Sequence, residues 1–430
     1  MIRHAATLCL ALAGALLLAP GSCAAAPAGS PFVVVLHDGL DAPAAVMSDL
    51  AAGLRFKLRL RYDDALDGFA TDLTGAQLAA LQADPAVAFV QPDVIVTGAG
   101  SVALAAGETA PPGIRRVGGV TAAGAHPAAA GAVAVLDSGV DLANPDLDAR
   151  NGTNCVSPSM PAQDDRGHGT NVAGVIGARN TGFGVSGVAP ATTIYAVKVL
   201  NKNGMGTLSQ ILCGINWVTA NAPRLGIQVA NMSVSGTGSD DGSCGNKNGD
   251  SWHKALCAST AAGVTWVVSA GNSGADFART IPAAYPEALT VTAMSDTDGI
   301  PGAAGPAPSC KKGEADDRYA AYSNYAVAPA AAAHTIAAPG TCVVSTKLGG
   351  GFSTYYGTSQ AAPHVAGAVA LCLGTAAGPG PCAGLPPAGV IQAVRADAVA
   401  GDTLAGGFNG DPLRPLVGRS FGPLVTAAAY

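Results

Sequence analysis

The chain has 430 residues, which is more than one average domain needs and enough to bury a large core. Only 12% of the residues are charged whereas 49% are hydrophobic, so disorder through lack of core-forming residues is excluded. The net charge of −6 and the absence of a long Lys/Arg run also argue against a nucleic-acid partner.

The N-terminus has the composition of a targeting segment. Arg3 precedes an apolar run at 5–19 and a stretch of small residues at 20–26. This run is too short to span a bilayer comfortably, so we predict a cleaved signal peptide over residues 1–26. No later segment is apolar for long enough to anchor the chain, and we therefore expect a secreted, extracellular protein without a membrane partner. A lipid on Cys23 or a periplasmic location is less favoured, because the residues before Cys23 fit a lipoprotein cleavage pattern poorly.

Residues 32–97 have the pattern of a small domain of their own. Strands and helices are expected in the order β-α-β-(β)-α-β, which describes a small antiparallel α+β sheet backed by two helices. In the stretch 55–62, basic and apolar residues alternate strictly, which predicts a half-buried strand with one basic face. The other expected elements are strands at 32–39 and 86–93 and helices at 42–54 and 74–85.

A Gly/Ala/Pro-rich stretch at 98–111 predicts a linker and processing region, and a larger domain is expected over 112–400. There, fully apolar strands alternate with helices, which predicts a mainly parallel α/β sheet with helices on both faces. Residues 401–430 are assigned to a C-terminal extension of this domain. The expected strands are 131–139, 193–200, 227–236, 264–272 and 288–294, and the expected helices are 169–178, 208–222 and 251–263.

Eight of the ten cysteines follow the predicted signal peptide. An even number in an exported chain favours disulfides, and the lack of a Cys-x-x-Cys pair disfavours structural zinc. Eight cysteines permit about 105 pairings, among which the spacing cannot choose. Cys244–Cys257 and Cys372–Cys382 are the local closures that we consider first. The eight cysteines are Cys155, Cys213, Cys244, Cys257, Cys310, Cys342, Cys372 and Cys382.

Four polar residues stand at the ends of expected elements. Asp137 ends the apolar strand in "VAVLDSG", His168 lies at the mouth of a helix in "RGHGTNVAG", and Ser359 lies at another in "GTSQAAPHVAG". An acid, a base and a hydroxyl are the groups that nucleophilic catalysis needs. Asn272 in "SAGNSG" adds an amide that can donate to a developing oxyanion.

Each of these residues alone has a simpler explanation. A serine before a helix is usually an N-cap, an aspartate after a strand usually forms a turn, and an asparagine among glycines usually serves a left-handed conformation. Their joint occurrence, each in a glycine-rich frame at an element end, favours catalysis.

The ordered motifs "VLDSGVD", "RGHGTNVAG", "SAGNSG" and "GTSQAAPHVAG" resemble the signature blocks of the subtilisin-like serine peptidases, the subtilases, and in particular the secreted, disulfide-bearing proteinase K-like branch. Residues 32–97 resemble the inhibitory propeptide of that family, and "PPGIRRV" at 111–117 resembles the start of its mature enzyme. The resemblance covers about Phe32 to Ala400.

The resemblance implies a secreted serine endopeptidase, made as a self-processing zymogen, that hydrolyses proteins through an acyl-enzyme. Asp137, His168 and Ser359 match the triad, and Asn272 matches the oxyanion asparagine. The substrate-binding residues that it implies are Ser233, Val234, Ser235, Gly236, Ser269, Ala270 and Gly271. Substrate would pair with the first of these segments as an added β-strand. Because no Asp or Glu is evident there, we expect a preference for uncharged substrate side chains.

Protein or peptide substrates and the chain's own propeptide are the expected partners, and we expect a monomer. No cofactor is implied for catalysis. Calcium as a structural ion is left open, with carbonyls around Ile281–Ala288 as candidates and Thr335 where relatives often carry a ligating aspartate. His126, His253 and His334 lack ligand spacing, so no metal is assigned to them, and His364 is expected to be a hydrogen-bonded structural residue.

The chain departs from the family pattern at three positions. Gln360 follows the expected nucleophile where a methionine is usual, and glutamine cannot form a sulfoxide, so activity is expected to survive peroxide. Asn171 and Ser235 replace a common histidine and a common glycine without removing a catalytic atom.

Two alternatives compete with this interpretation. One is a catalytically silent binding or inhibitory protein on the same scaffold, which the complete set of four chemical positions disfavours. The other is a sedolisin-type peptidase, which pairs serine with Glu and Asp, and His168 within its full motif argues against it.

Overall fold

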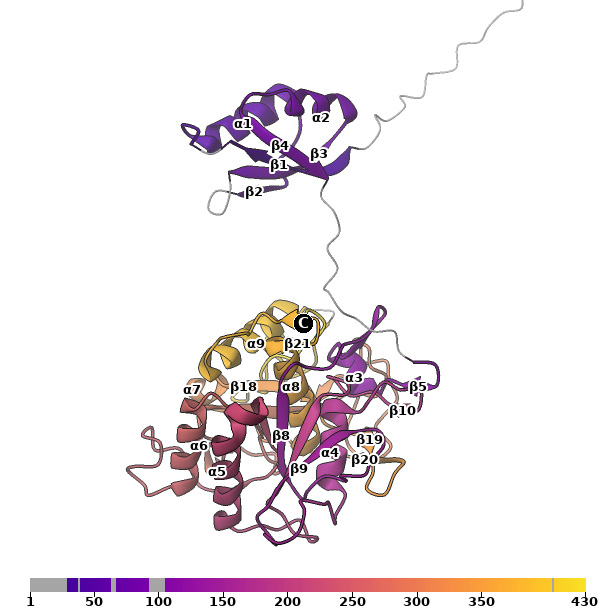
Figure 1. The fold of residues 1–430 in the computed structure, drawn as a ribbon, viewed down its shortest axis with the longest axis vertical. Coiled ribbons are helices and arrows are strands. Elements are labelled where there is room, and N and C mark those ends of the chain that lie inside the picture. The colour runs from indigo at the N-terminus through magenta and orange to yellow at the C-terminus, as the bar shows by residue number, and fades with distance from the viewer. Residues whose placement is uncertain (1–28, 38, 63–66, 93–104, 404–405) are drawn as a thin grey trace, which may run out of the picture. The chain divides into compact units, whose positions relative to one another are not determined.

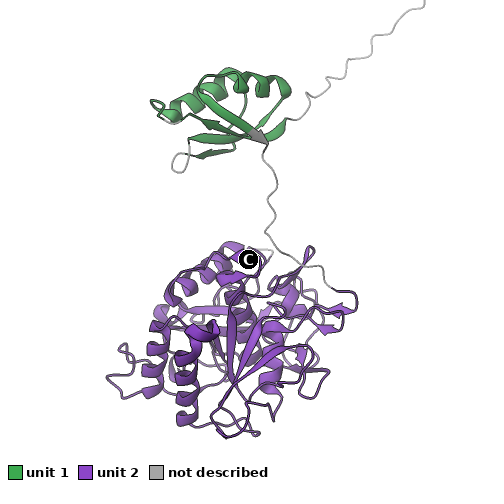
Figure 2. Ribbon diagram, viewed as in Figure 1, with its two compact units in different colours: residues 1–97 green, residues 98–430 purple. Residues whose placement is uncertain are grey.

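The computed structural model describes residues 29–37, 39–62, 67–92, 105–403 and 406–430 (Figure 1). The chain divides into two compact units, residues 1–97 and 98–430 (Figure 2). The predicted signal peptide and the first part of the predicted linker lie outside the described residues. Among the described residues, the longest apolar helices fall short of what crossing a membrane requires.

Unit 1 is a four-stranded antiparallel sheet with two helices, as the sequence predicted. The strand order is β2-β3-β1-β4, and the core contains Val34, Met47, Phe69 and Leu81. Thr74 and Gln77 form a reciprocal capping box that starts the second helix. The elements are β1 (Ser30–Leu36), α1 (Pro43–Leu54), β2 (Leu60–Tyr62), β3 (Gly68–Leu73), α2 (Gly75–Gln82) and β4 (Val87–Pro92).

The expected strand at 55–62 is mostly wrong. Only Leu60–Tyr62 forms a strand, and Arg55 takes a left-handed conformation that ends α1. Leu60 is 59% exposed, although the alternation placed it on the buried face. Because β2 is an edge strand with one neighbour, little of its length needs to pair or to be covered.

Unit 2 is built on an eight-stranded sheet. The order is β17-β16-β14-β12-β8-β11-β9, with β18 also on β16, and every pair except β16–β17 is parallel. The strands are β8 (Ala132–Asp137), β9 (Asp148–Asn154), β11 (Thr193–Lys198), β12 (Ile227–Met232), β14 (Thr265–Ser269), β16 (Ala288–Ser295), β17 (Arg318–Tyr319) and β18 (Thr335–Pro339).

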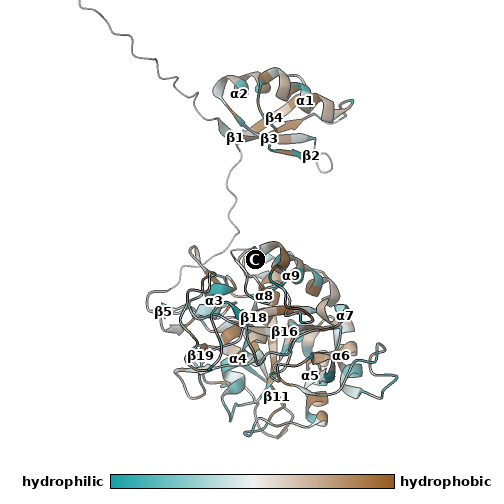
Figure 3. Cartoon of the chain, turned by 180° about the vertical axis from the view of Figure 1, so that it is seen from behind, coloured by the Kyte–Doolittle hydropathy of each residue, from teal (hydrophilic) through white to brown (hydrophobic). Residues whose placement is uncertain are grey.

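Helices cover both faces of this sheet, as expected for a parallel sheet. Successive residues of β8 point to opposite faces. Val133 and Val135 join the core that contains α4, α8 and α9, whereas Ala134 and Leu136 join the core that contains α5 and α6. In Figure 3 the peripheral loops carry much of the hydrophilic colour. The helices are α4 (His168–Gly177), α5 (Leu208–Leu225), α6 (Ser251–Ala261), α8 (Thr358–Leu373) and α9 (Pro387–Gly401).

Short elements complete unit 2. The helices are α3 (Pro112–Arg116), η1 (Phe277–Arg279) and α7 (Pro329–Ala332). The strands are β5 (Glu108–Thr109), β6 (Val120–Thr121), β7 (Gly124–Ala125), β10 (Gly184–Val185), β13 (Gly236–Thr237), β15 (Thr280–Ile281), β19 (Val343–Thr346), β20 (Phe352–Tyr355), β21 (Gly374–Thr375) and β22 (Gly378–Pro379).

The end of the predicted linker is ordered against unit 2. β5 pairs in parallel with β10, and Glu108 Oε2 accepts hydrogen bonds from the backbone of Thr181 and Gly182. A Gly/Ala-rich composition did not reveal these long-range contacts.

The tail after residue 401 also belongs to unit 2, because Phe408, Phe421 and Leu424 pack with Met294 and Ala337.

All eight described cysteines are paired. The two local closures considered from the sequence, Cys244–Cys257 and Cys372–Cys382, are both present. The two longer pairs, Cys155–Cys213 and Cys310–Cys342, join segments that only the fold brings together.

Candidate active site

The candidate residues gather at the carboxyl edge of the sheet of unit 2. Asp137 is the last residue of β8, Ser233 follows β12, and Asn272 lies three residues beyond β14. The strands β8, β12 and β14 are parallel neighbours, so their carboxyl ends meet at one edge. In open parallel sheets this is the edge where ligands bind.

Asp137 and His168 form a close pair. The carboxylate oxygens of Asp137 lie 2.8 and 2.9 Å from His168 Nδ1. Asp137 is fully buried, whereas the side chain of His168 retains 17% exposure. Burial opposes protonation of His168, but the carboxylate outweighs it and raises the pKa of His168 above its usual 6.5. Nδ1 is thereby committed to Asp137, which leaves Nε2 as the end of the ring that can exchange a proton.

The motif around His168 explains why the ring lies there. Asp164 accepts hydrogen bonds from the backbone of Gly167 and Thr170, which satisfies donors at the start of α4. A Cβ added to Gly169 would lie 2.0 Å from the carbonyl oxygen of Gly139, so only glycine lets α4 approach the end of β8 this closely. The ring of Tyr355 then packs edge-on against His168, with the centroids 6.1 Å apart.

Ser359 lies in the first turn of α8 and is tied to the segment after β12. Pro363 has no N–H to offer to the carbonyl of Ser359, four residues earlier. Ser233 Oγ supplies the missing donor at 2.8 Å, and Ser359 Oγ in turn lies 3.3 Å from the carbonyl oxygen of Ser233. The proline thus frees an acceptor, and a long-range contact replaces the helical bond.

Asn272 is oriented by its neighbour in the first turn of α8. Its Oδ1 accepts hydrogen bonds from the backbone N–H of Thr358 at 2.8 Å and from Thr358 Oγ1 at 3.0 Å. With the carbonyl end of the amide held there, the NH₂ end is the part that can donate to another group. Gly357, just before Thr358, has a φ of +145°, a backbone conformation that residues with a Cβ rarely adopt.

These side chains line one pocket of about 620 Å³. It brings His168, Ser359 and Asn272 together with predicted substrate-binding residues, namely Ser233, Val234, Ser235, Gly236, Ser269 and Gly271. Asp137 and Ala270 are fully buried and lie behind the lining, not in it. No carboxylate is among the lining residues within the described part of the chain.

Sequence reasoning missed the far wall of this pocket. Arg166, Met205, Leu208, Ile211 and Trp252 also line it. Arg166 lies two residues before His168 in the same motif, and this nearness was the only sequence feature that indicated its place in the pocket. The others belong to the loop before α5, to α5 and to α6, and only the packing of those helices brings them to the pocket.

The remaining histidines differ from one another. His364 is fully buried, lies 2.9 Å through Nδ1 from the carbonyl oxygen of Gln360, and burial lowers its pKa to about 4, so it is a structural residue as predicted. His126 and His334 each contact a backbone carbonyl. His253 instead lies among three carboxylates, which the sequence spacing did not indicate.

Two buried carboxylates outside the pocket were also missed. Neither carboxylate oxygen of Asp146 has a hydrogen-bond partner, and Oε1 of Glu108 has none either. Burial and the neighbouring Glu108 raise the pKa of Asp146 to about 7. Backbone groups of Val185 and Arg179 only partly offset these two effects. Two neighbouring buried carboxylates with three such oxygens favour a cation between them.

The matches to known proteins cover both units. Residues 129–395 match the model of the Subtilase family, and residues 33–98 match that of Peptidase inhibitor I9. An alkaline protease of Shouchella clausii is 35% identical over 307 residues, 70% of this chain and 67% of the relative. Subtilisin E of Bacillus subtilis strain 168 is 34% identical over 298 residues, 68% and 67% of the two chains.

A solved structure agrees with these relatives. The crystal structure of a cold adapted subtilisin-like serine proteinase superposes with a TM-score of 0.54 at 26% identity, covering 74% of this chain and 98% of the other.

Proposed function

The chain belongs to the subtilase family of serine peptidases, and we propose that Asp137, His168 and Ser359 are its catalytic triad, with Asn272 as an oxyanion donor. The chain is a serine endopeptidase that carries its own inhibitory propeptide and is made as a zymogen. The observation that carries the proposal is the single pocket that contains His168, Ser359 and Asn272 beside the buried Asp137.

The arrangement supports a two-step acyl transfer. Ser359 Oγ attacks the substrate carbonyl carbon while its proton passes to His168 Nε2, and Asp137 stabilises the imidazolium that forms. The oxygen of the tetrahedral intermediate accepts from Asn272 Nδ2 and from the backbone N–H of Ser359 at the positive end of α8. His168 then returns the proton to the leaving amine, the acyl-enzyme forms, and water reverses the sequence to release the acid.

Self-processing supplies the test of these roles. We expect Ser359→Ala to remain an uncleaved precursor and to lose about 10⁶-fold in kcat, the loss known for subtilisin, a relative of this chain, when its triad serine is removed. Intact mass of the product measures processing, and hydrolysis of a fluorogenic peptide measures kcat. Labelling with a fluorophosphonate tests whether the unaltered protein has a reactive serine. Normal processing of Ser359→Ala, or no labelling of the unaltered protein, would refute the assignment and favour a silent scaffold.

The processing point belongs to the same proposal. We place the cut within 98–111 and before Glu108, because Glu108 is bound to the catalytic unit through β5 and through two backbone donors. The proposed domains remain those expected from the sequence: a signal peptide at 1–26, a propeptide at 32–97, a linker and processing region at 98–111, a catalytic domain at 112–400 and its extension at 401–430. Four disulfides support export to an oxidising compartment, and we propose a secreted monomer.

The preference for uncharged side chains rests on the lining of the pocket. Its charged lining residue is Arg166, which repels a cationic substrate side chain. Fluorogenic peptides that carry Phe, Leu, Lys or Glu at the cleavage position measure the preference, and a higher kcat/KM for Lys or for Glu than for Phe and Leu would contradict it.

Calcium fits Asp146 and Glu108 better than the segment around Ile281–Ala288 that the sequence suggested. Their three unpartnered carboxylate oxygens are hard, anionic ligands of the kind that Ca²⁺ prefers. A bound cation would offset the burial and the repulsion by Glu108 that raise the pKa of Asp146. It would also join β5 to the loop after β8.

Chelation measures this calcium site without relying on catalysis. Thermal unfolding of the protein inactivated with phenylmethylsulfonyl fluoride should shift down on dialysis against EGTA and recover with Ca²⁺, because a ligand at 100 times its Kd adds about 2.7 kcal/mol to the unfolding free energy. Asp146→Asn should abolish the response, and Asp298→Asn, at a partly buried carboxylate elsewhere in unit 2, should keep it. An unchanged response in Asp146→Asn would place calcium elsewhere.

A further inference from the structure

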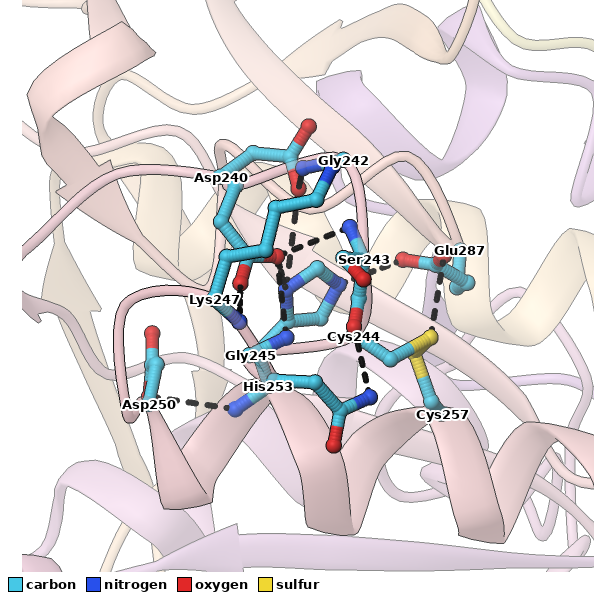
Figure 4. The surroundings of a disulfide bond; sticks show 12 residues. Asp240, Gly242, Ser243, Cys244, Gly245, Lys247, Asp250, His253, Cys257 and Glu287 are labelled. Carbon is cyan, nitrogen blue, oxygen red and sulfur yellow. Dashed lines mark hydrogen bonds and ion pairs between the residues drawn. A yellow bond between two sulfur atoms is a disulfide. The ribbon is translucent and has the colours of Figure 1, made fainter.

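The first observation concerns a buried imidazole at the start of α6, away from the triad. The side chain of His253 has no exposure. Its Nε2 lies 2.8 Å from Glu287 Oε2, and its ring stacks on Tyr285 with the centroids 4.0 Å apart. Figure 4 shows His253 between Glu287 on one side and Asp240 on the other.

The other ring nitrogen has no hydrogen-bond partner. His253 Nδ1 is a buried atom without a donor or acceptor, and it lies 3.6 Å from Asp240 Oδ1 and 3.8 Å from Asp241 Oδ1. These separations are too long for a proton to bridge the ring and a carboxylate. A Zn²⁺ ion with bonds of about 2.0–2.2 Å holds two tetrahedral ligands roughly 3.3–3.5 Å apart, which is close to what is observed.

The two carboxylates are also prepared as ligands. Backbone N–H groups donate to both carboxylate oxygens of Asp241, from Ser243 and Gly245 to Oδ1 and from Lys247 and Asn248 to Oδ2. These bonds hold the carboxylate in a fixed position beside His253. The side chain of Asp240 is 32% exposed, so an ion and its remaining water ligand have a route from solvent.

Glu287 completes the pattern expected around a metal-bound histidine. A ligating imidazole usually donates its second N–H to a carboxylate, which fixes the ring and increases its basicity. Glu287 accepts from Nε2 and so leaves the lone pair of Nδ1 directed at the two aspartates. The sulfurs of Cys244 and Cys257 lie near the same group but are joined in a disulfide, so they are not among the ligands.

We propose that His253 Nδ1, Asp240 Oδ1 and Asp241 Oδ1 bind one divalent transition-metal ion of the Zn²⁺ type. An imidazole ligand and a small set of donors favour such an ion over Ca²⁺, which takes six to eight oxygens. The ion joins the loop 238–250 to α6, beside the disulfide. That loop directly follows β13 at the substrate pocket, and Trp252 next to His253 lines the pocket, so the ion would stabilise this wall.

The test is metal binding to the untagged protein after its own processing, inactivated with phenylmethylsulfonyl fluoride to prevent autolysis and freed of metal by a chelating resin. Calorimetric titration with Zn²⁺ should give one equivalent, and Co²⁺ should show the intense visible bands of a four-coordinate site. Excess Ca²⁺ should not displace either ion. Because Nδ1 must be free of a proton to bind the ion, the affinity should fall as the pH is lowered.

The variants locate the ion. Asp240→Asn changes a partly exposed side chain and should reduce the affinity at least tenfold while the fold, followed by circular dichroism, is kept. Asp298→Asn, in a separate acidic cluster with Asp296 and Asp316, is the matched control and should bind as the unaltered protein does. No stoichiometric binding, or equal binding by Asp240→Asn, would overturn the proposal. Loss of binding in Asp298→Asn alone would do so as well, because it would place the ion in the other cluster.

Discussion

Two histidines of unit 2, His168 and His253, have the same kind of carboxylate partner but different surroundings at the other ring nitrogen. Each has one ring nitrogen 2.8 Å from a carboxylate oxygen, Asp137 in the first case and Glu287 in the second. Each carboxylate raises the pKa of its imidazole against the opposing effect of burial. A carboxylate–imidazole pair alone therefore does not identify a catalytic base.

The difference lies at the second nitrogen. The free end of His168 belongs to a pocket of about 620 Å³ that also contains Ser359. The free end of His253 is closed in by Asp240 and Asp241 and is reached by no hydrogen-bond partner. A neutral hydroxyl beside a ring nitrogen makes that nitrogen a proton acceptor, whereas two anions beside it favour a cation. What surrounds the second nitrogen decides the role.

Replacing the carboxylate of the first pair should have the larger effect. Asp137→Asn should lower kcat by about 10⁴-fold, because the amide favours the wrong tautomer of His168. As a general base His168 must be neutral, so kcat/KM of the unaltered enzyme falls as the pH drops through the raised pKa of this residue. In Asp137→Asn that acidic limb should move to lower pH. Pre-steady-state kinetics measure the loss in kcat, and the pH dependence of kcat/KM measures the shift of the acidic limb. If the limb does not move in Asp137→Asn, Asp137 does not set the pKa of the group that limits the rate at low pH.

Replacing the carboxylate of the second pair should act on metal affinity. Glu287→Gln retains an oxygen that can accept from His253 Nε2 but removes its charge, and loss of such an outer partner typically costs about 10–100-fold in affinity. Zn²⁺ titration of the variant and of the control Asp298→Asn measures this. If Glu287→Gln binds Zn²⁺ as tightly as the control does, the charge of Glu287 does not contribute to the metal site. The two carboxylate–histidine pairs would then resemble each other in geometry but not in function.

The smallest effect is expected next to the first pair. Gln360 is buried beside Ser359, and its Nε2 lacks a hydrogen-bond partner, so Gln360→Met should change kcat little in the absence of oxidant. In mild peroxide the thioether becomes a sulfoxide, and the variant should lose activity with time while the unaltered enzyme keeps it. Equal inactivation of the two would show that residue 360 is not the sensitive position.

Local sequence patterns predicted much of the architecture. Fully apolar segments such as 131–139 indicated the parallel strands, and glycine-rich motifs at strand and helix ends were sufficient to mark Asp137, His168, Ser359 and Asn272 as candidates. These features depend on neighbours in the chain, since burial on both faces demands apolar residues and a close helix–strand contact demands glycine, as at Gly169. The alternation at 55–62 misled us because an edge strand is only partly covered.

Contacts between distant segments were decided by the tertiary structure alone. The exchange of hydrogen bonds between Ser233 and Ser359 spans 126 residues, and the group of His253, Glu287 and Asp240 joins a helix, a turn and a loop. The buried Asp146 and Glu108 are likewise brought together by the pairing of β5 with β10. Spacing along the chain cannot reveal such groups, because their chemistry depends on which polar atoms are buried next to one another. Which atoms these are is determined only when the helices pack on the sheet.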